Sequence, residues 1–270
     1  MELITSRRNP LVARLRALHQ PKGRREQGLL LLEGTHLLQE VLRLGLAPER
    51  LLASEAWLAR HGALLSAAGL MAQPVGEEVL AAVATTEHPD GVVLTLPAAA
   101  LPRASGHGGF VLALDQLQDP GNLGTLLRTA LAAGVEEVWL GGGADPLQPK
   151  VLRASAGAAL ALPLRREPAR AGLLPLLQAA RRAGHQLVAT LVEGGAGAAA
   201  APPIPYWQLD WTRPTVLLLG NEGAGLHPEL AALASQRVTI PHSSAVESLN
   251  VAVAAGPLLL ERWRQQRQRA

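Results

Sequence analysis

The chain has 270 residues, of which 48% are hydrophobic, 17% are charged and none is cysteine. Its length allows one large domain or two modest ones, its apolar content excludes a disordered chain, and the lack of cysteine excludes a disulfide scaffold. The 25 basic and 22 acidic residues leave a net charge of +3, which is weak evidence for a nucleic-acid partner. Neither a membrane span of about 20 apolar residues nor a signal-peptide core is found, so we expect a cytoplasmic protein with no membrane partner.

Basic residues concentrate at the two ends of the chain. Residues 1–25 carry seven basic side chains against the single acid Glu2, and the C-terminal segment ERWRQQRQRA adds four arginines. Such clusters are typical of surfaces that bind phosphate groups. A solvated helix face in an arginine-rich protein would carry the same charges, and composition does not separate the two interpretations.

The first part of the chain alternates helical patterns with short apolar runs. Helical spacing predicts helices at Pro10–His19, Thr35–Leu44, Trp57–Ala68 and Glu77–Val83. Apolar runs predict strands at Gly28–Glu33, Leu51–Ala53 and Gly91–Leu96. This alternation predicts a small α/β domain over residues 1–97, followed by a linker at 98–108 where Pro, Gly, Ala and Ser replace any apolar periodicity.

A larger domain is predicted over residues 109–270. Its strands are predicted at Phe110–Leu114, Glu137–Leu140, Leu187–Leu191, Thr215–Leu219 and Arg237–Ile240, and its helices at Leu123–Ala133, Gln148–Ala156, Ala171–Arg182, Pro228–Ala234 and Ser248–Trp263. Continuous apolar strands are typical of a sheet buried on both faces, so we expect a mostly parallel sheet with helices on both sides. Ligands bind at the carboxyl ends of such strands. Ala198–Pro205 is of low complexity and is expected to be a surface loop.

Several common signatures are absent from the sequence. Neither Lys22 nor Lys150 belongs to a P-loop, and the glycines 141–143 do not extend to a dinucleotide fingerprint. The eight histidines show no zinc-like pairing, and Ser155 lacks the first glycine of a nucleophile elbow. These absences argue against P-loop ATPases, ordinary dinucleotide enzymes, metal hydrolases and serine hydrolases, and we expect no metal site.

Three polar clusters each follow a predicted strand. In the first, Asn122 is expected to cap a helix that carries Arg128, which would make an anion site, although an ordinary cap and a surface arginine would show the same spacing. In the second, three glycines within residues 220–225 permit close backbone approach, and Glu222 between them is either a hydrogen-bond organiser or a turn acid. In the third, Ser248 or Asn250 opens the C-terminal helix.

Together and in this order, these clusters resemble the SpoU (TrmH-type) family of RNA ribose 2′-O-methyltransferases, in the SPOUT superfamily. The family motif N-x-G-x-x-x-R-x-A matches Asn122, Gly124, Arg128 and Ala130; L-x-x-G-x-E-x-x-G matches Leu217, Gly220, Glu222 and Gly225; and I-P…S-L-N-V matches Ile240, Pro241, Ser248, Leu249, Asn250 and Val251. Residues 150–158 resemble the family segment R-x-S-x-G-A, and residues 7–34 resemble its N-terminal substrate-binding domain, a small ribosomal-protein-like α/β fold.

The resemblance implies methyl transfer from S-adenosylmethionine to a ribose 2′-hydroxyl, most readily in rRNA. tRNA is the alternative substrate, and a non-catalytic RNA-binding protein or a nucleotide-dependent α/β enzyme are alternative functions. The cofactor residues implied by position are Thr190, Leu219, Gly220, Gly225, Ile240 and Leu249. The catalytic residues implied are Arg128, Asn122, Glu222, Ser248 and Asn250, and the RNA-binding residues expected are Arg7, Arg8, Arg24, Arg25 and Arg153.

The resemblance also implies a deep C-terminal trefoil knot and a homodimer with the helix Ser248–Trp263 in its interface. Arg128 is then expected to act next to the methyl donor of the other subunit. Because a guanidinium stays protonated, we expect Arg128 to act electrostatically rather than as a base. Two departures from the family are Gly256-Pro257 inside the C-terminal helix, where a proline is expected to kink it, and His242 where many relatives have methionine.

Overall fold

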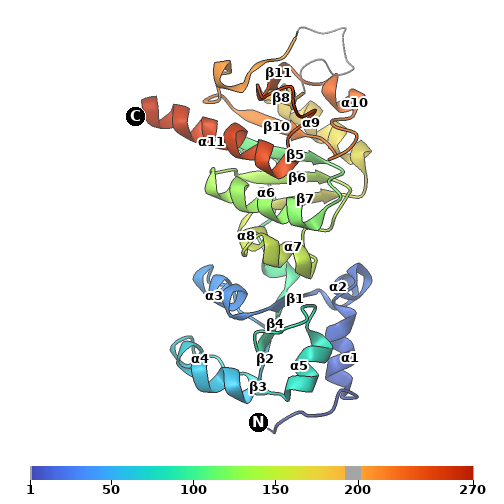
Figure 1. Ribbon diagram of the computed structural model, residues 1–270, viewed down its shortest axis with the longest axis vertical. Helices are drawn as coiled ribbons and strands as arrows, with labels where there is room; N and C mark the ends of the chain where they lie inside the picture. The colour runs from blue at the N-terminus through green and yellow to red at the C-terminus, as the bar shows by residue number, and fades with distance from the viewer. Residues whose placement is uncertain (1, 192–201, 270) are drawn as a thin grey trace. The chain divides into compact units, whose positions relative to one another are not determined.

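The computed structural model describes residues 2–191 and 202–269, and the chain divides into two compact units (Figure 1). Unit 1 comprises Met1–Leu101 and Pro146–Ala161, and unit 2 comprises Pro102–Asp145 and Leu162–Ala270. Residues 146–161 were predicted to belong to the larger domain, but their helix α7 (Pro149–Ala154) packs against strand β1 of unit 1. The predicted domain boundaries otherwise stay a prediction.

Unit 1 is built on a four-stranded mixed sheet in the order β1-β4-β2-β3. Its strands are β1 (Leu29–Glu33), β2 (Arg50–Ala53), β3 (Gln73–Pro74) and β4 (Val92–Pro97). Its helices are α1 (Pro10–Ala17), α2 (Pro21–Gln27), α3 (Thr35–Arg43), α4 (Glu55–Ala67), α5 (Glu77–Val83), the 3-10 turn η1 (Ala98–Ala100), α7 and α8 (Ala158–Ala161). The sequence missed α2 because its residues PKGRREQ have no apolar periodicity.

Unit 2 is built on a seven-stranded sheet in the order β7-β6-β5-β10-β8-β11-β9. The strands are β5 (Phe110–Asp115), β6 (Glu137–Gly141), β7 (Leu164–Glu167), β8 (Gln186–Thr190), β9 (Ile204–Pro205), β10 (Thr215–Leu219) and β11 (Gln236–Thr239). Every strand pair described in this sheet is parallel, which confirms the predicted mostly parallel sheet. The sequence missed β7 and β9, because one is polar and the other has only two residues.

Helices cover both faces of this sheet. They are α6 (Pro120–Ala132), α9 (Leu173–Arg182), α10 (Pro228–Ala231) and α11 (Val251–Arg269), with 3-10 turns η2 (Arg170–Gly172) and η3 (Tyr206–Gln208). Val111 and Ala113 of β5 share one buried cluster with residues of α9. The Arg262 guanidinium of α11 lies 4.8 Å from the centre of the Phe110 ring, and successive strand residues point to opposite faces, so α11 covers the other side. There α11 packs beside α6 (Figure 1).

The C-terminal helix is continuous from Val251 to Arg269 even though Pro257 lies inside it. No helix among the described residues combines the length and the apolar content that crossing a bilayer requires. Residues 198–201 of the predicted loop Ala198–Pro205 lie outside the described residues, and Ile204–Pro205 form β9.

Candidate active site and cofactor pocket

A cavity of about 490 Å³ opens where β8, β10 and β11 end. Its wall contains every residue predicted to bind the cofactor, namely Thr190, Leu219, Gly220, Gly225, Ile240 and Leu249. It also contains four of the five predicted catalytic residues, namely Asn122, Glu222, Ser248 and Asn250. The carboxyl ends of parallel strands meet at one edge of a sheet, which is why Asn122 and Asn250, 128 residues apart, share this wall.

Helix α6 begins differently from the prediction, because its N-cap is Asp119 and not Asn122. The Asp119 carboxylate accepts a hydrogen bond from the backbone N–H of Asn122 at 2.7 Å, and Pro120 occupies the first turn. Asn122 therefore lies inside the helix. Its side chain is left free to bond across the cavity wall.

Hydrogen bonds join the three motifs at the cavity. The Asn250 side-chain amide donates to the Asn122 oxygen at 3.0 Å, and the Asn122 amide donates to the Glu222 carboxylate at 3.4 Å. Asn250 also caps α11, because its oxygen accepts from the backbone N–H groups of Ala252 and Val253 at 2.9 and 3.3 Å. Of the two caps predicted for this helix, Asn250 is the one used. One side chain thus starts the helix and orients Asn122.

Glu222 organises the start of α6 from the neighbouring loop. Its two carboxylate oxygens accept from the backbone N–H groups of Gln118 and Asp119, each at 3.1 Å. Burial alone would raise the pKa of Glu222, but these backbone hydrogen bonds, with that from Asn122, outweigh burial and lower it. Glu222 is therefore ionised at neutral pH, where it is a poor proton acceptor and a good anchor for donors.

The backbone approaches itself closely at Gly220. A Cβ there would lie 2.1 Å from both the carbonyl carbon of Gly225 and the nitrogen of Leu226, so only glycine fits. Gly225 has φ of +68°, a conformation that glycine adopts without penalty. Beside this loop, the Thr190 hydroxyl is buried and has no hydrogen-bond partner among the described residues. The cavity therefore offers backbone groups and one unused hydroxyl to a ligand.

Arg128 is the one predicted catalytic residue that does not line this cavity. It lies exposed on α6. None of the ion pairs among the described residues involves it, which leaves its guanidinium available for a phosphate group. His242 does line the cavity, and its Nδ1 lies 2.7 Å from the Ile240 carbonyl oxygen.

The arginines predicted to bind RNA divide by exposure. Arg7, Arg8 and Arg25 are exposed in unit 1. Arg24 is only 6% exposed and donates through Nη1 to the carbonyl oxygens of Leu18 and His19 at 2.8 and 3.0 Å. The prediction for Arg24 is thus corrected, because this side chain caps the end of α1 instead of facing solvent.

Arg153 is also engaged within its own unit. Its Nη1 lies 3.4 Å from the carboxylate of Glu33, which is 7% exposed, and it also donates to the Thr85 hydroxyl. Glu33 further accepts from the Thr85 backbone N–H at 2.8 Å and from the Thr86 hydroxyl. Burial raises the pKa of Glu33, but the hydroxyl and backbone donors, with Arg153, produce a net lowering. The guanidinium predicted to meet RNA neutralises a buried carboxylate instead.

Two of the C-terminal arginines are likewise structural. Arg262 is 8% exposed and donates to the carbonyl oxygens of Trp211 and Arg213, each at 2.6 Å. Arg264 pairs with Glu261 at 2.6 Å. Charge counting along the sequence therefore overestimated the phosphate-binding surface at this end.

Among the described residues, no group of three or more histidines and carboxylates lies close enough together to hold a metal ion.

Comparison with known proteins identifies relatives of both parts of the chain. Residues 9–94 match the MRM3-like substrate binding domain, and residues 109–260 match the SpoU rRNA Methylase family. An uncharacterized tRNA/rRNA methyltransferase of Synechocystis is 45% identical, over 97% of this chain and 94% of the relative. The Bacillus subtilis 23S rRNA (guanosine(2553)-2′-O)-methyltransferase RlmP is 33% identical, over 96% and 98%.

A solved structure is similar over the same extent. The crystal structure of an AdoMet-bound rRNA methyltransferase from Sinorhizobium meliloti has a TM-score of 0.80 and 34% identity, and the match covers 98% of each chain. Since the family match spans residues 109–260 and the relatives are similar over nearly their whole length, the chain belongs to the SpoU rRNA Methylase family.

Proposed function

We propose that this chain transfers a methyl group from S-adenosylmethionine to a ribose 2′-hydroxyl of rRNA. The observation that carries the proposal is the hydrogen-bonded series Glu222–Asn122–Asn250, which arranges three separate motifs around one cavity. The Bacillus relative is a 23S rRNA 2′-O-methyltransferase, and the Sinorhizobium structure holds AdoMet. Both similarities extend over nearly the full length of this chain.

The cavity fits S-adenosylmethionine by size and by donor set. Its volume of about 490 Å³ lies within the range of about 300–1,000 Å³ typical of small-molecule sites. The buried Thr190 hydroxyl lacks a partner among the described residues. Gly220 and Gly225 both line the cavity, and a Cβ at Gly225 would meet no atom within 4 Å, so a ligand can approach the backbone closely there. When bound, S-adenosylmethionine supplies an electrophilic methyl group on its sulfonium. Leu219, Ile240 and Leu249 would hold it together with these three residues, largely through backbone N–H and C=O groups.

The remaining residues have to make a weak nucleophile react. A ribose hydroxyl needs a group that accepts its proton or stabilises the developing alkoxide. Asn122, Ser248 and Asn250 orient the ribose by hydrogen bonding, and Glu222 keeps Asn122 in place. Arg128 binds the phosphate next to the target ribose and stabilises the negative charge that develops on the 2′-oxygen, with the proton passing to phosphate or water.

A homodimer completes this site in our proposal. Arg128 does not line the cavity of its own chain, so it would act next to the methyl donor bound by the other subunit. Helix α11 carries exposed apolar side chains at Val253, Leu260 and Trp263. A Cβ at Gly256 of the same helix would meet no atom within 4 Å, so a second helix could approach closely there. These features support α11 as the dimer interface.

The deep trefoil knot and the RNA-binding role of unit 1 are parts of the same proposal. Helix α11 follows β11, which is two strands beyond β10, yet it returns to pack beside α6. In unit 1 the exposed Arg7, Arg8 and Arg25 supply positive charge for an RNA backbone.

The test is methyl transfer to RNA that has not been exposed to this enzyme. Purified protein is incubated with methyl-labelled S-adenosylmethionine and either total rRNA or total tRNA from a strain lacking the gene, and the labelled nucleotides are mapped by mass. We expect labelled 2′-O-methylribose in rRNA. Label only in tRNA would identify the alternative substrate. No transfer to either RNA or to intact ribosomal particles, with the cofactor still bound, would favour a non-catalytic RNA-binding protein.

A further inference from the structure

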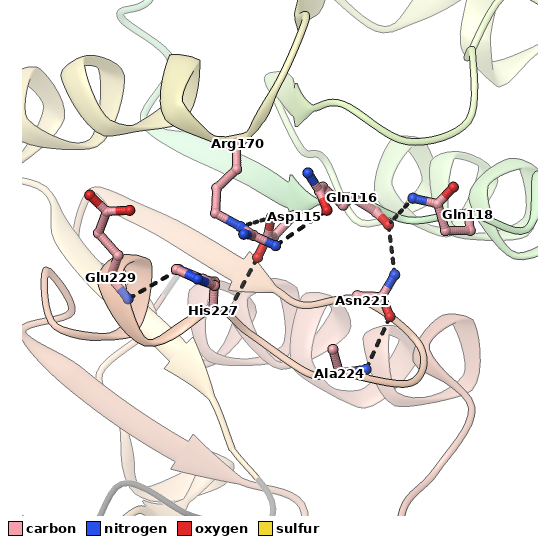
Figure 2. Close-up of polar contacts among 8 residues, drawn as sticks. All are labelled: Asp115, Gln116, Gln118, Arg170, Asn221, Ala224, His227 and Glu229. Atoms are coloured by element: carbon pink, nitrogen blue, oxygen red, sulfur yellow. Dashed lines mark hydrogen bonds and ion pairs between the residues drawn. The ribbon is translucent and has the colours of Figure 1, made fainter.

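A partly buried ion pair adjoins the loop that lines the cavity. Asp115, the last residue of β5, is 1% exposed, and Arg170 of η2 donates through Nε to its Oδ1 at 2.8 Å (Figure 2). Burying the Asp115 charge is costly, and apolar replacements of buried ion pairs are often no less stable, so the pair by itself is weak evidence of a purely stabilising role. Its hydrogen-bond partners indicate a different role.

Asp115 holds the far end of the loop. Its second oxygen, Oδ2, accepts from the backbone N–H of His227 at 3.2 Å. His227 is the N-cap of α10 and directly follows Leu226, which lines the cavity. The carboxylate therefore determines where the loop ends and the helix begins.

Gln116 holds the near end of the same loop. Its φ of 52° is uncommon for a residue other than glycine. Its backbone carbonyl oxygen accepts from the side-chain amide of Asn221 at 2.9 Å. Arg170 reaches this residue as well, since its Nη2 donates to the Gln116 side-chain oxygen at 3.3 Å. One guanidinium thus contacts both residues that anchor the loop, as Figure 2 shows.

The loop between the two anchors is internally tied. The Asn221 side-chain oxygen accepts from the backbone N–H groups of Gly223 and Ala224 at 2.9 and 3.0 Å. The backbones of Asn221 and Gly225 exchange two further hydrogen bonds, at 3.0 and 2.9 Å. Because these hydrogen bonds connect the residues of the loop to one another, a displacement at either anchor moves residues 220–226 of the cavity wall together.

We propose that Asp115 and Arg170 are positioning residues for cofactor binding. Their ion pair holds residues 220–226 in the conformation that binds S-adenosylmethionine, an inference that rests on the proposed function. Neither side chain lines the cavity, so both act through His227 and Gln116. The two residues are 55 positions apart and belong to none of the three motifs, so no sequence pattern marks them.

The test compares S-adenosylmethionine binding by full-length variants in isothermal titration calorimetry. Arg170→Gln should raise the dissociation constant about tenfold, because it removes a charge-assisted hydrogen bond to a buried carboxylate. Arg170→Lys keeps the charge but not both hydrogen bonds, and it should recover part of the affinity. Arg165→Gln is the matched control, because it removes a 2.9 Å ion pair to Glu167 elsewhere in unit 2.

A kinetic readout separates positioning from simple destabilisation. With Arg170→Gln, the KM for S-adenosylmethionine should rise by the same factor as the dissociation constant, while the KM for rRNA stays within about twofold. A purely structural defect would reduce the active fraction and leave both KM values unchanged. Cofactor affinity equal to that of Arg165→Gln would overturn the proposal. If the unaltered protein binds no S-adenosylmethionine, the proposed function fails first and this inference falls with it.

Discussion

Each unit contains a carboxylate that gathers hydrogen bonds from distant chain segments, and the two carboxylates differ in whether a cation accompanies them. Glu33 in unit 1 accepts hydroxyl and backbone donors and is paired with Arg153 at 3.4 Å. Glu222 in unit 2 accepts backbone donors and the Asn122 amide. It takes part in none of the ion pairs found among the described residues.

This difference indicates that the hydrogen bonds around Glu33 stabilise the fold, whereas those around Glu222 belong to the candidate active site. Around Glu33 the charges are balanced inside the protein, so the network is complete without a ligand. Around Glu222 the network borders an open cavity, and the exposed Arg128 of α6 takes part in no ion pair within the described part of the chain. Polar side chains whose charge or hydrogen-bonding capacity is not satisfied within the chain are the ones that can bind RNA or cofactor.

The largest effect is expected at Arg128. Arg128→Ala should lower kcat at least about 100-fold, because it removes a preorganised positive charge from the developing alkoxide. Binding of S-adenosylmethionine should stay within about twofold, since Arg128 does not line the cavity. Single-turnover methylation and calorimetry measure the two quantities. Arg181→Ala, at another exposed arginine of unit 2, is the control and should change neither. Equal loss of cofactor affinity would contradict the assignment.

The paired arginine should show the opposite behaviour. Arg153→Met leaves the buried Glu33 carboxylate without its cation and should lower the free energy of unfolding by about 2 kcal/mol. Urea unfolding followed by circular dichroism measures this loss. Arg25→Met, at an exposed arginine of the same unit, should leave the unfolding midpoint unchanged and weaken rRNA binding instead. Full stability of Arg153→Met together with weaker RNA binding would restore the predicted RNA contact.

A smaller effect is expected at Glu222. Glu222→Gln keeps the shape of the side chain but weakens its hydrogen bonds to the backbone N–H groups of Gln118 and Asp119, so turnover should fall about tenfold. Glu229→Gln is the matched control, because Glu229 is an exposed carboxylate on the adjacent helix α10. Steady-state methylation rates measure both. Wild-type turnover in Glu222→Gln would show that a neutral acceptor suffices at this position.

The smallest effect is a pH dependence that the two carboxylates share. The folded-state pKa is lowered for both Glu33 and Glu222, so each contributes stability that is fully present above the unfolded value of about 4.3 and is lost as the pH falls through the folded-state pKa. Urea midpoints should therefore be flat between neutral pH and about 5 and then decline with acid. Glu33→Gln should make that decline shallower, and an unchanged decline would exclude Glu33 as a contributor.

Local patterns were sufficient for most of the fold. Apolar runs located β5 and β10 to within a residue, and helical spacing located α5 and α9, because period and burial are properties of neighbouring residues. The resemblance of three motifs to one family was enough to name most of the predicted site residues that line one cavity, although Arg128 is not among them. Strands such as β9, with only two residues, carry too little pattern to be recognised.

Long-range pairing was decided only by the tertiary structure. Arg24 and Arg25 are adjacent and chemically identical, yet one is buried against the end of α1 and the other is exposed. Asp115 and Arg170 meet across 55 positions without any motif to mark them. The type of a residue determines which partners it can bind. Whether its charge is neutralised, buried or left for a ligand depends on which distant segments pack against it, and the sequence contains that information only through the complete fold.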